Sequence, residues 1–575
     1  MKRNASFVLA WALPAALQLL ACRDETHPTQ LGAEPAILTR TIPTLARPRR
    51  TNLDWKRCDL LTDSGTAKNA AECATMEVPL QRSTTNGPVL TLFVKRIRPV
   101  ETPRGQLWLV NGGPGAPASS FEANLELFTK VGKDLEVYLL DHRGTGQSTY
   151  LECAQIGTED GESTSTTSGE AWGECASSLV ARFGEGLAGF NVTEAAADLG
   201  EAIGRTRHGD EPVFIYSVSY GTYLAQRYLQ LYPTQPSGIV LDSICSPGAC
   251  RLLLGYDRAF DETANDVFAL CAKDQNCAEQ LGDAPFERLK AVERSLDTGH
   301  CAALGWSKKT LRQIMGFMVM YVGLRDYMPA VTRRVERCGS NDVQSLTAFA
   351  KLLRSISTDE SGFSEVLSTH IALSELSEAP LPSKQEILAN VEELAASLDA
   401  GPPLADAVAT WPVYQPDRYF GQFAVTSVPM LMLNGTLDPQ TPMSVAEPVS
   451  THFTATHQTF VRIPQAAHTT LTQSPIDENG NTCGAELIRQ FYDAPEKKLE
   501  SYVPRLRATH RLCWRYRANS SALRYHFSLG RRSTEMAFRH HSPWYANARA
   551  FGSTTKHAYP QFAALCAMTI LPSLS

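Results

Sequence analysis

The chain has 575 residues, of which 43% are hydrophobic and 20% charged, values typical of a soluble globular protein. A single core stops growing at roughly 250–300 residues, so we expect a full core with additions. The net charge of −6 hides an asymmetry, because residues 501–575 carry eleven Lys or Arg but only one acid, Glu535. An acidic body with a basic end argues against nucleic acid as a partner.

The first 22 residues have the pattern of an export signal. Lys2 and Arg3 provide a positive start, and Phe7 to Ala21 is an almost unbroken apolar stretch. The ending Leu19-Leu-Ala-Cys22 resembles the lipobox of bacterial lipoproteins, whose cysteine carries the lipid; a plain secretory signal is the alternative. We expect an extracytoplasmic protein, either secreted or in contact with a membrane only through a lipid anchor at Cys22.

Strand patterns then alternate with helical periods, which predicts a mostly parallel sheet. Residues 23–52 are polar and Pro-rich and are expected to form a linker. The predicted strands are Met76–Leu80 and Val89–Val94 as a hairpin, followed by Gln106–Val110, Leu135–Leu140, Val213–Tyr216, Gly238–Asp242, Val428–Asn434 and Thr459–Ile463. Helical periods cover 193–205, capped by Asn191 or Thr193, the stretch between Ser219 and Pro233, and then 311–322, 343–355 and 384–398.

These patterns predict an α/β architecture with an inserted helical cap. Residues 53–245 are expected to form the first part of the core, and residues 425–503 the second part. Helical periods dominate residues 246–424 between them, which predicts a cap over the carboxyl edge of the sheet, where open α/β sheets bind ligands. Residues 504–575 show no period and are expected to be a basic tail of unclear structure.

Besides Cys22, thirteen cysteines fit an oxidising compartment. Their spacing suggests local disulfides, although sequence alone does not fix the connectivity. The neighbouring pairs are Cys58/Cys73, Cys153/Cys175, Cys245/Cys250, Cys271/Cys277, Cys301/Cys338 and Cys483/Cys513, with Cys566 left over. Clusters with zinc-ligand spacing are missing from the sequence, so we expect neither a metal nor a cofactor.

Ser219 follows an apolar strand and precedes a helix, the context of a nucleophile elbow. The usual pattern has small residues two positions before and after the serine, and here these are Ser217 and Gly221. A serine-rich strand end is the alternative interpretation.

A serine nucleophile needs an acid and a histidine after later strands. Asp438 follows the strand that ends at Asn434, and it is preferred over Asp242 because one more strand and a loop histidine come after it. That histidine is His468; His142, His452 and His457 are the alternatives.

Two backbone amides are expected to bind the oxyanion. One is the amide of Tyr220, directly after the serine, and the other comes from Asn111-Gly-Gly-Pro-Gly115, where Gly113 is favoured over Gly112.

Together, Asn111-Gly-Gly-Pro-Gly115, Asp141-His-Arg-Gly-Thr-Gly-Gln-Ser148, the Ser219 elbow, Asp438-Pro-Gln-Thr-Pro442 and His468 resemble the prolyl iminopeptidase and tripeptidyl aminopeptidase family of α/β-hydrolases. The similarity covers roughly residues 53–503, and Trp55-Lys-Arg-Cys58 and Cys73 to Leu80 resemble its secreted tripeptidyl aminopeptidase branch more closely.

The resemblance implies an exported serine exopeptidase that releases N-terminal residues or short peptides from substrates with a free N-terminus. It implies Ser219 as nucleophile, Asp438 as orienting acid and His468 as general base, with the Asp141–Ser148 loop as structural support. A carboxylic ester hydrolase on the same scaffold remains the alternative, and a non-catalytic binding protein is a third possibility. A carboxylate for the substrate ammonium group is expected in the cap, with Asp261, Glu262, Asp266 and Glu365 as open candidates.

Overall fold

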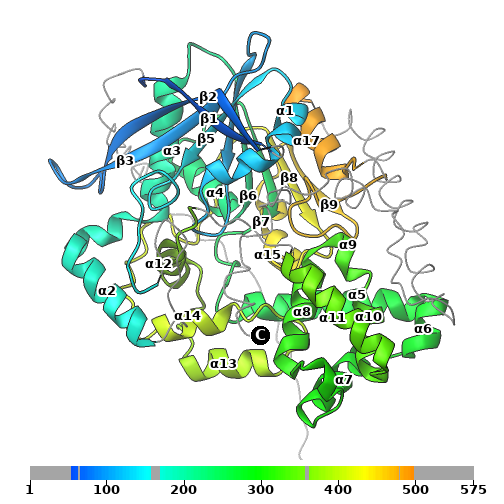
Figure 1. Cartoon of the computed structure of the whole chain (residues 1–575). Helices are drawn as coiled ribbons and strands as arrows, with labels where there is room; N and C mark the ends of the chain where they lie inside the picture. Colours follow the sequence, from blue (N-terminus) through cyan, green and yellow to red (C-terminus); the bar gives the residue numbers. More distant parts are fainter. Residues whose placement is uncertain (1–52, 63–64, 157–168, 356–361, 478–479, 498–575) are drawn as a thin grey trace, which may run out of the picture. The chain divides into compact units, whose positions relative to one another are not determined.

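The computed structural model describes residues 53–62, 65–156, 169–355, 362–477 and 480–497 (Figure 1). The predicted signal over residues 1–22 with Cys22, the linker over 23–52 and the tail over 504–575 with Cys513 and Cys566 lie outside these described residues.

A nine-stranded sheet forms the centre of the described chain, in the order β1-β2-β3-β5-β4-β6-β7-β8-β9. The strands are β1 (Lys56–Thr62), β2 (Gly65–Pro79), β3 (Val89–Ile97), β4 (Gly105–Val110), β5 (Leu135–Asp141), β6 (Val213–Ser219), β7 (Gly238–Ile244), β8 (Met430–Gly435) and β9 (Gln458–Ile463). Pairing is antiparallel from β1 through β3 to β5 and parallel from β5 onward. The predicted mostly parallel sheet is therefore confirmed.

Helices cover both faces of this sheet, and successive strand residues point to opposite faces. Trp108 and Ile215 share a buried cluster with α3 (Val192–Thr206) and α4 (Tyr220–Leu231). Leu107 and Phe214 share another cluster with α1 (Leu125–Val131) and α17 (Cys483–Asp493). Because both faces are covered, every residue of β4 to β8 is buried, which explains their continuous apolar sequence runs.

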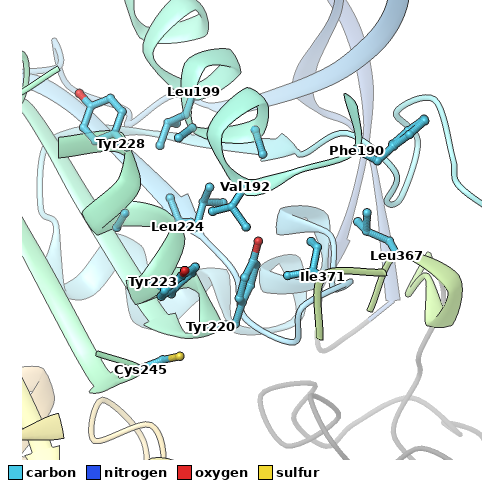
Figure 2. Packing of buried hydrophobic residues seen from close by; sticks show 14 of the residues in the cluster. Phe190, Val192, Leu199, Tyr220, Tyr223, Leu224, Tyr228, Cys245, Leu367 and Ile371 are labelled. Carbon is cyan, nitrogen blue, oxygen red and sulfur yellow. The ribbon is translucent and has the colours of Figure 1, made fainter. Parts of the chain in front are cut away.

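The described residues between β7 and β8 contain helices and no strand. These helices are α5 (Gly255–Lys273), α6 (Gln275–Leu281), α7 (Pro285–Asp297), α8 (Lys308–Met320), α9 (Val322–Arg325), α10 (Met328–Arg337), α11 (Ser340–Ser355), α12 (Glu365–Glu375), α13 (Lys384–Glu392) and α14 (Gly401–Ala407), with the short 3-10 helix η3 (Ala302–Leu304). Residues of α5 to α8, α10 and α11 form a buried cluster of their own, whereas α12 packs with the core, where Leu367 and Ile371 lie in one cluster with Tyr220 and Leu224 (Figure 2). We refer to α5–α14 as the cap.

The remaining elements lie in the connections between the strands. They are η1 (Ala118–Asn124), α2 (Gly169–Phe183), η2 (Gly184–Gly189), α15 (Met443–Ala446) and α16 (Pro448–His452). Of the two predicted N-cap residues of α3, Asn191 is the one observed, and its side chain accepts a hydrogen bond from the Glu194 backbone amide at 2.8 Å. No described helix combines the length and the apolar character that a bilayer crossing requires.

One predicted helix was too long. The period over 384–398 indicates a single helix, but α13 ends at Glu392. The Ala395 and Ala396 amides donate to the Asp261 carboxylate at 2.6 and 3.1 Å instead of to helical carbonyls. Tertiary contacts therefore replace the last turns of the helix. The sequence also gave no sign of β1, which pairs along the edge of β2.

Five of the predicted disulfides are present: Cys58–Cys73, Cys153–Cys175, Cys245–Cys250, Cys271–Cys277 and Cys301–Cys338. Cys483 is disulfide-bonded as well, and Cys513, its expected partner, lies outside the described residues. Because disulfides form and persist in oxidising compartments, they indicate an extracytoplasmic protein.

Candidate active site

Ser219 occupies a strained corner between a strand and a helix. It is the last residue of β6, and α4 begins at Tyr220. Its φ of 57° and ψ of −131° form a backbone conformation that costs energy for any residue but glycine. Such a turn presents a serine hydroxyl at the carboxyl edge of the sheet. The local structure is thus that of a nucleophile elbow.

Close packing explains the small residues on either side of Ser219. A Cβ atom added to Gly221 would lie 2.4 Å from the carbonyl oxygen of Val110, so no side chain fits there. Ser217 is fully buried, and its hydroxyl donates to the carbonyl oxygen of Val240 at 2.8 Å. The serine that replaces the usual first glycine is therefore accommodated with its polar group paired.

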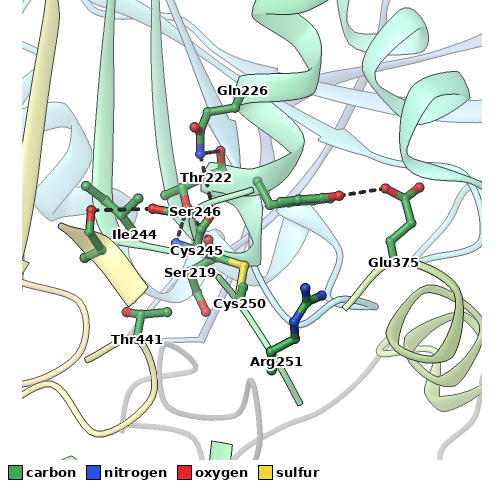
Figure 3. The surroundings of a disulfide bond; sticks show 12 residues. Ser219, Thr222, Gln226, Ile244, Cys245, Ser246, Cys250, Arg251, Glu375 and Thr441 are labelled. Carbon is green, nitrogen blue, oxygen red and sulfur yellow. Dashed lines mark hydrogen bonds between the residues drawn. A yellow bond between two sulfur atoms is a disulfide. The ribbon is translucent and has the colours of Figure 1, made fainter. Parts of the chain in front are cut away.

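The Cys245–Cys250 disulfide lies beside this elbow (Figure 3). The Thr222 hydroxyl, in the first turn of α4, donates to the carbonyl oxygen of Ser219 at 2.6 Å and accepts the Cys245 amide at 2.9 Å. The Gln226 amide group donates to the Cys245 carbonyl at 3.3 Å. The segment after β7 and the nucleophile turn are thus held together by hydrogen bonds.

Asp438 and His468 form a buried pair. Asp438 follows β8 and His468 follows β9, and their side chains are almost fully buried. Nδ1 of His468 lies 2.9 Å from each carboxylate oxygen of Asp438. Oδ1 of Asp438 also accepts the backbone amides of Gln440 and Thr441, both at 2.9 Å. The loop after β8 therefore holds the Asp438 carboxylate in a fixed orientation toward the histidine.

The second ring nitrogen of His468 is available for chemistry. Nε2 is buried and makes no hydrogen bond to any described residue. Buried polar atoms are normally paired, so one that is not needs an explanation. With Nδ1 donating to Asp438, Nε2 is the acceptor that a general base would use, and hydrogen bonds to a nucleophile are often formed only once substrate is bound.

Sequence reasoning missed Thr441, which joins the same pair. Its hydroxyl donates to Oδ2 of Asp438 at 2.8 Å and lies 3.3 Å from Nδ1 of His468. The position three residues after Asp438 was visible in the sequence, but nothing there distinguished this threonine from an ordinary turn residue.

Asp242, the alternative acid, binds the backbone that follows His468 instead of the imidazole. It lies near the end of β7, beside the loop that follows β9. Its carboxylate accepts the backbone amides of Thr470 and Leu471 at 2.8 and 2.9 Å. It also accepts the Thr470 hydroxyl at 2.7 Å and the Tyr216 hydroxyl at 2.9 Å. Burial raises the pKa of Asp242 above its ordinary value, against the effect of these hydrogen bonds. The Ser243 hydroxyl accepts the next amide, from Thr469, at 2.7 Å. The end of β7 thus clamps the backbone that follows His468.

The alternative histidines make structural contacts elsewhere. His142 is buried with Nδ1 3.1 Å from the Arg143 carbonyl, and burial lowers its pKa to about 4. Nε2 of His452 lies 2.9 Å from the Ala424 carbonyl, and Nε2 of His457 contacts that of Ser427. Among the histidines considered, His468 is the one paired with a buried carboxylate.

The loop after β4 has the properties expected of an oxyanion donor. The Gly112 amide donates to the Asn111 side chain at 2.8 Å, so it is already engaged. Gly113 has a φ of 111° and its amide makes no hydrogen bond within the described chain. The Tyr220 amide, in the first turn of α4, has no acceptor within its helix. Gly113 and Tyr220 stay predictions as the donor pair.

The Asp141–Ser148 loop is a buried support. Asp141 accepts the amides of Ser119 and Gln147 at 2.8 and 3.0 Å, and burial raises its pKa to about 6. The Arg143 guanidinium forms two hydrogen bonds with Asp198, at 2.7 and 2.8 Å. These contacts tie the loop to α3 and, through Ser119, to η1.

The beginning of α12 contacts the loop that carries Gly113. The Ser364 amide donates to the Gly115 carbonyl at 3.0 Å, and the Ser364 hydroxyl donates to the Leu151 carbonyl at 2.6 Å. A Cβ atom on Gly115 would meet the Ser364 carbonyl at 2.5 Å. The cap therefore touches the loop that carries the expected oxyanion donor Gly113.

The chemistry that this edge can perform is acyl transfer. It combines a serine in a strained turn, a carboxylate–imidazole pair with one unpaired nitrogen, and a glycine loop with amides suited to a developing oxyanion. Among the residues that the structure describes, no three metal-ligating side chains gather into a cluster.

Two protein families match the chain. Residues 107–277 match the family described as alpha/beta hydrolase fold, and residues 398–500 match the family described as TAP-like protein. The first segment contains Gly113 and Ser219, and the second contains Asp438 and His468.

Several known proteins are similar to the chain at low identity. The tripeptidyl aminopeptidase of Streptomyces lividans is 26% identical over 42% of this chain and 48% of its own length, so the chain spans about half of that relative. Serine protease Hip1 of Mycobacterium tuberculosis is 23% identical over 85% of this chain and 95% of its own length. The putative hydrolase YuaR of Escherichia coli is 24% identical over 39% of this chain and 48% of its own length. These matches support a serine peptidase-like hydrolase with the α/β-hydrolase fold, similar at low identity to a tripeptidyl aminopeptidase and a serine protease.

Proposed function

We propose that the protein is an exported serine aminopeptidase that releases N-terminal residues or short peptides through an acyl-enzyme. The observation that carries this proposal is the buried Asp438–His468 pair. Nε2 of His468 makes no hydrogen bond to a described residue, and the pair lies at the same edge of the sheet as Ser219. The names of the similar Streptomyces and Mycobacterium proteins, an aminopeptidase and a serine protease, support a peptide as substrate.

The proposed reaction has two steps. Ser219 Oγ attacks the scissile carbonyl while its proton passes to Nε2 of His468, and the Gly113 and Tyr220 amides bind the oxyanion. The imidazolium, stabilised by Asp438, then gives that proton to the leaving amine, which departs and leaves an ester on Ser219. Water attacks this ester while His468 accepts its proton, and the imidazolium then returns the proton to Ser219 Oγ as the bond to the acyl group breaks and the carboxylic acid leaves.

The first experiment is labelling with a fluorophosphonate probe together with peptide digestion. We expect labelling in the wild-type protein, none in Ser219→Ala, and release of N-terminal products from free peptides but not from N-acetylated ones. Equal turnover of blocked and free substrates would show an ester hydrolase or an endopeptidase instead. An unlabelled, folded wild-type protein would contradict serine catalysis altogether and favour a binding role.

Recognition of a free N-terminus needs a carboxylate, and we propose Glu365 among the four candidate acids that the sequence offered in the cap. Asp261 is engaged by two backbone amides, and Glu262 and Asp266 are exposed on α5. Glu365 is half-buried and directly follows Ser364, which binds the oxyanion loop through Gly115. Glu365→Gln should raise KM for free peptides about tenfold or more, because a charged hydrogen bond is lost, whereas the control Glu262→Gln should not. A KM that stays unchanged in Glu365→Gln would remove this residue from the site.

We also propose that Cys22 carries a lipid anchor. The sequence Leu19-Leu-Ala-Cys22 after the apolar stretch supports this. In the bacterial host, the wild-type protein should fractionate with membranes and Cys22→Ala should not. Membrane retention of Cys22→Ala would point to another means of attachment, and a soluble wild-type protein would point to plain secretion.

A further inference from the structure

The loops that carry Asp438 and His468 are joined to one another. We define the acid loop as residues 436–442, after β8, and the histidine loop as residues 464–474, after β9. The Thr436 amide donates to the Ile463 carbonyl at 3.0 Å and the Leu437 amide donates to the Ala466 carbonyl at 3.1 Å. The Gln465 amide donates to the Thr436 hydroxyl at 2.8 Å. A displacement of one loop is therefore passed to the other.

A buried arginine of the cap spans this junction. Arg325, the last residue of α9, is 2% exposed. Its Nη1 donates to the Leu437 carbonyl at 3.2 Å, and its Nη2 donates to the Gln465 carbonyl at 2.5 Å. The guanidinium is a rigid, permanently charged fork, so it fixes the separation of the two acceptors that it binds. One side chain thereby sets the spacing between the acid loop and the histidine loop.

Further contacts hold the same part of the cap against these loops. The Leu437 side chain is buried in the cap's own apolar cluster rather than in the sheet core. The Val322 amide, at the start of α9, donates to the Gln473 side chain at 3.1 Å. The Gln473 carbonyl in turn accepts the Ala467 amide at 3.2 Å, next to His468. Backbone, side-chain and apolar contacts thus agree in anchoring α9 to both loops.

We propose that Arg325 is a positioning residue for the reaction, an inference that rests on the proposed serine chemistry at Ser219. Leu437 directly precedes Asp438, and Gln465 lies three residues before His468. The cation therefore acts on the backbone of both loops and keeps the imidazole and the carboxylate at 2.9 Å. Both of these hydrogen bonds go to backbone carbonyls rather than to the two reacting side chains.

The test measures the rate at which a small fluorophosphonate labels Ser219, because this step needs the aligned histidine but little substrate binding by the cap. Arg325→Met preserves length and removes both donors, and we expect labelling to slow about 10- to 100-fold, the range that small misplacements of catalytic groups produce. With peptide substrates, kcat should fall while KM changes little. Arg325→Lys can reach only one of the two carbonyls, so its labelling rate should fall less. If Arg325→Met does not fold, the labelling rate of Arg325→Lys tests the proposal.

Arg312 provides a matched control. It is 1% exposed on α8, and its Nε and Nη2 donate to the two carboxylate oxygens of Asp399, both at 2.8 Å and both within the cap. Arg312→Met should lower the melting temperature while the folded protein is labelled at nearly the wild-type rate. Wild-type labelling in the folded Arg325 variants, or an equal loss in Arg312→Met, would overturn the proposal. A wild-type protein that is not labelled would instead contradict the proposed function itself.

Discussion

The hydroxyl of Thr441 offers the sharpest test of the Asp438–His468 pair. Oδ1 of Asp438 accepts two backbone amides, whereas the remaining partners of Oδ2 are the Thr441 hydroxyl at 2.8 Å and the imidazole at 2.9 Å. Thr441→Val keeps the shape of the side chain and removes only this hydroxyl. Oδ2 then keeps only the imidazole as a partner, so one of the contacts that orient the carboxylate toward His468 is lost.

The expected magnitude follows from the charge of the acceptor. A hydrogen bond to a charged group contributes about 1.5–3 kcal/mol. If this contribution is needed when the imidazolium forms, kcat/KM falls roughly 10- to 150-fold, because each 1.36 kcal/mol is tenfold in rate. The measurement is kcat and KM on a short free peptide, together with the rate of fluorophosphonate labelling.

Thr470→Val is the matched control for this variant. Thr470 is also a buried threonine whose hydroxyl donates to a buried aspartate, here Asp242 at 2.7 Å. Both variants should lose similar stability, but Thr470→Val leaves Asp242 with two backbone amides and the Tyr216 hydroxyl, so its activity should fall much less. Wild-type kcat/KM in Thr441→Val, or equal losses in the two variants, would refute the reasoning.

Three more predictions follow from buried polar groups. Ser217→Gly should lose about 1 kcal/mol of stability with the hydrogen bond to Val240, and should keep its labelling rate; a clear loss of labelling would show that the serine does more than fill space. Asp242→Asn places an amide group opposite backbone donors, so the free energy of unfolding measured in urea should fall by about 2–4 kcal/mol. The rate of fluorophosphonate labelling should also fall at least tenfold. An unchanged rate would mean that the contacts between Asp242 and the backbone after His468 do not position the histidine. Because burial lowers the pKa of His142 to about 4, the unfolded state binds a proton below pH 6.5 that the native state does not, and up to about 3 kcal/mol of stability is lost as the pH falls from 6.5 to 4. His142→Phe should therefore be less sensitive to acid in urea unfolding at pH 7 and 4.5, and equal sensitivity would contradict this account.

Local patterns predicted the elements of the site because each depends on nearby sequence. An apolar strand followed by a serine, a small residue and a helical period is sufficient to indicate the turn at Ser219. The order of later strands is sufficient to favour Asp438 and His468, which the structure brings into contact. The same reasoning preferred Asp438 over Asp242, and the physical distinction is now visible. The Asp242 carboxylate accepts hydrogen bonds from backbone amides and hydroxyl groups, whereas the Asp438 carboxylate also bonds to the imidazole of His468.

What the sequence could not indicate are the contacts between segments far apart in the chain. Arg325 lies 112 residues from Leu437 and 140 from Gln465, and nothing in its surroundings distinguishes it from other arginines of the cap. The early end of α13 has the same cause, since the carboxylate that captures its amides belongs to Asp261, 134 residues earlier. Periodicity reports which face of a segment is apolar, but a distant polar partner can override it.

The cap contacts the proposed reaction centre from two sides. On one side Ser364 of the cap binds the loop that carries Gly113, through the Gly115 carbonyl. On the other side Arg325 binds the loops that carry Asp438 and His468. A cap that moved as a rigid lid would have to break buried hydrogen bonds on both sides, which costs energy for every donor and acceptor left unpaired. We therefore expect the cap to couple substrate selection to the alignment of the loops that carry Asp438 and His468, and substitutions at these anchors that alter specificity should also alter kcat.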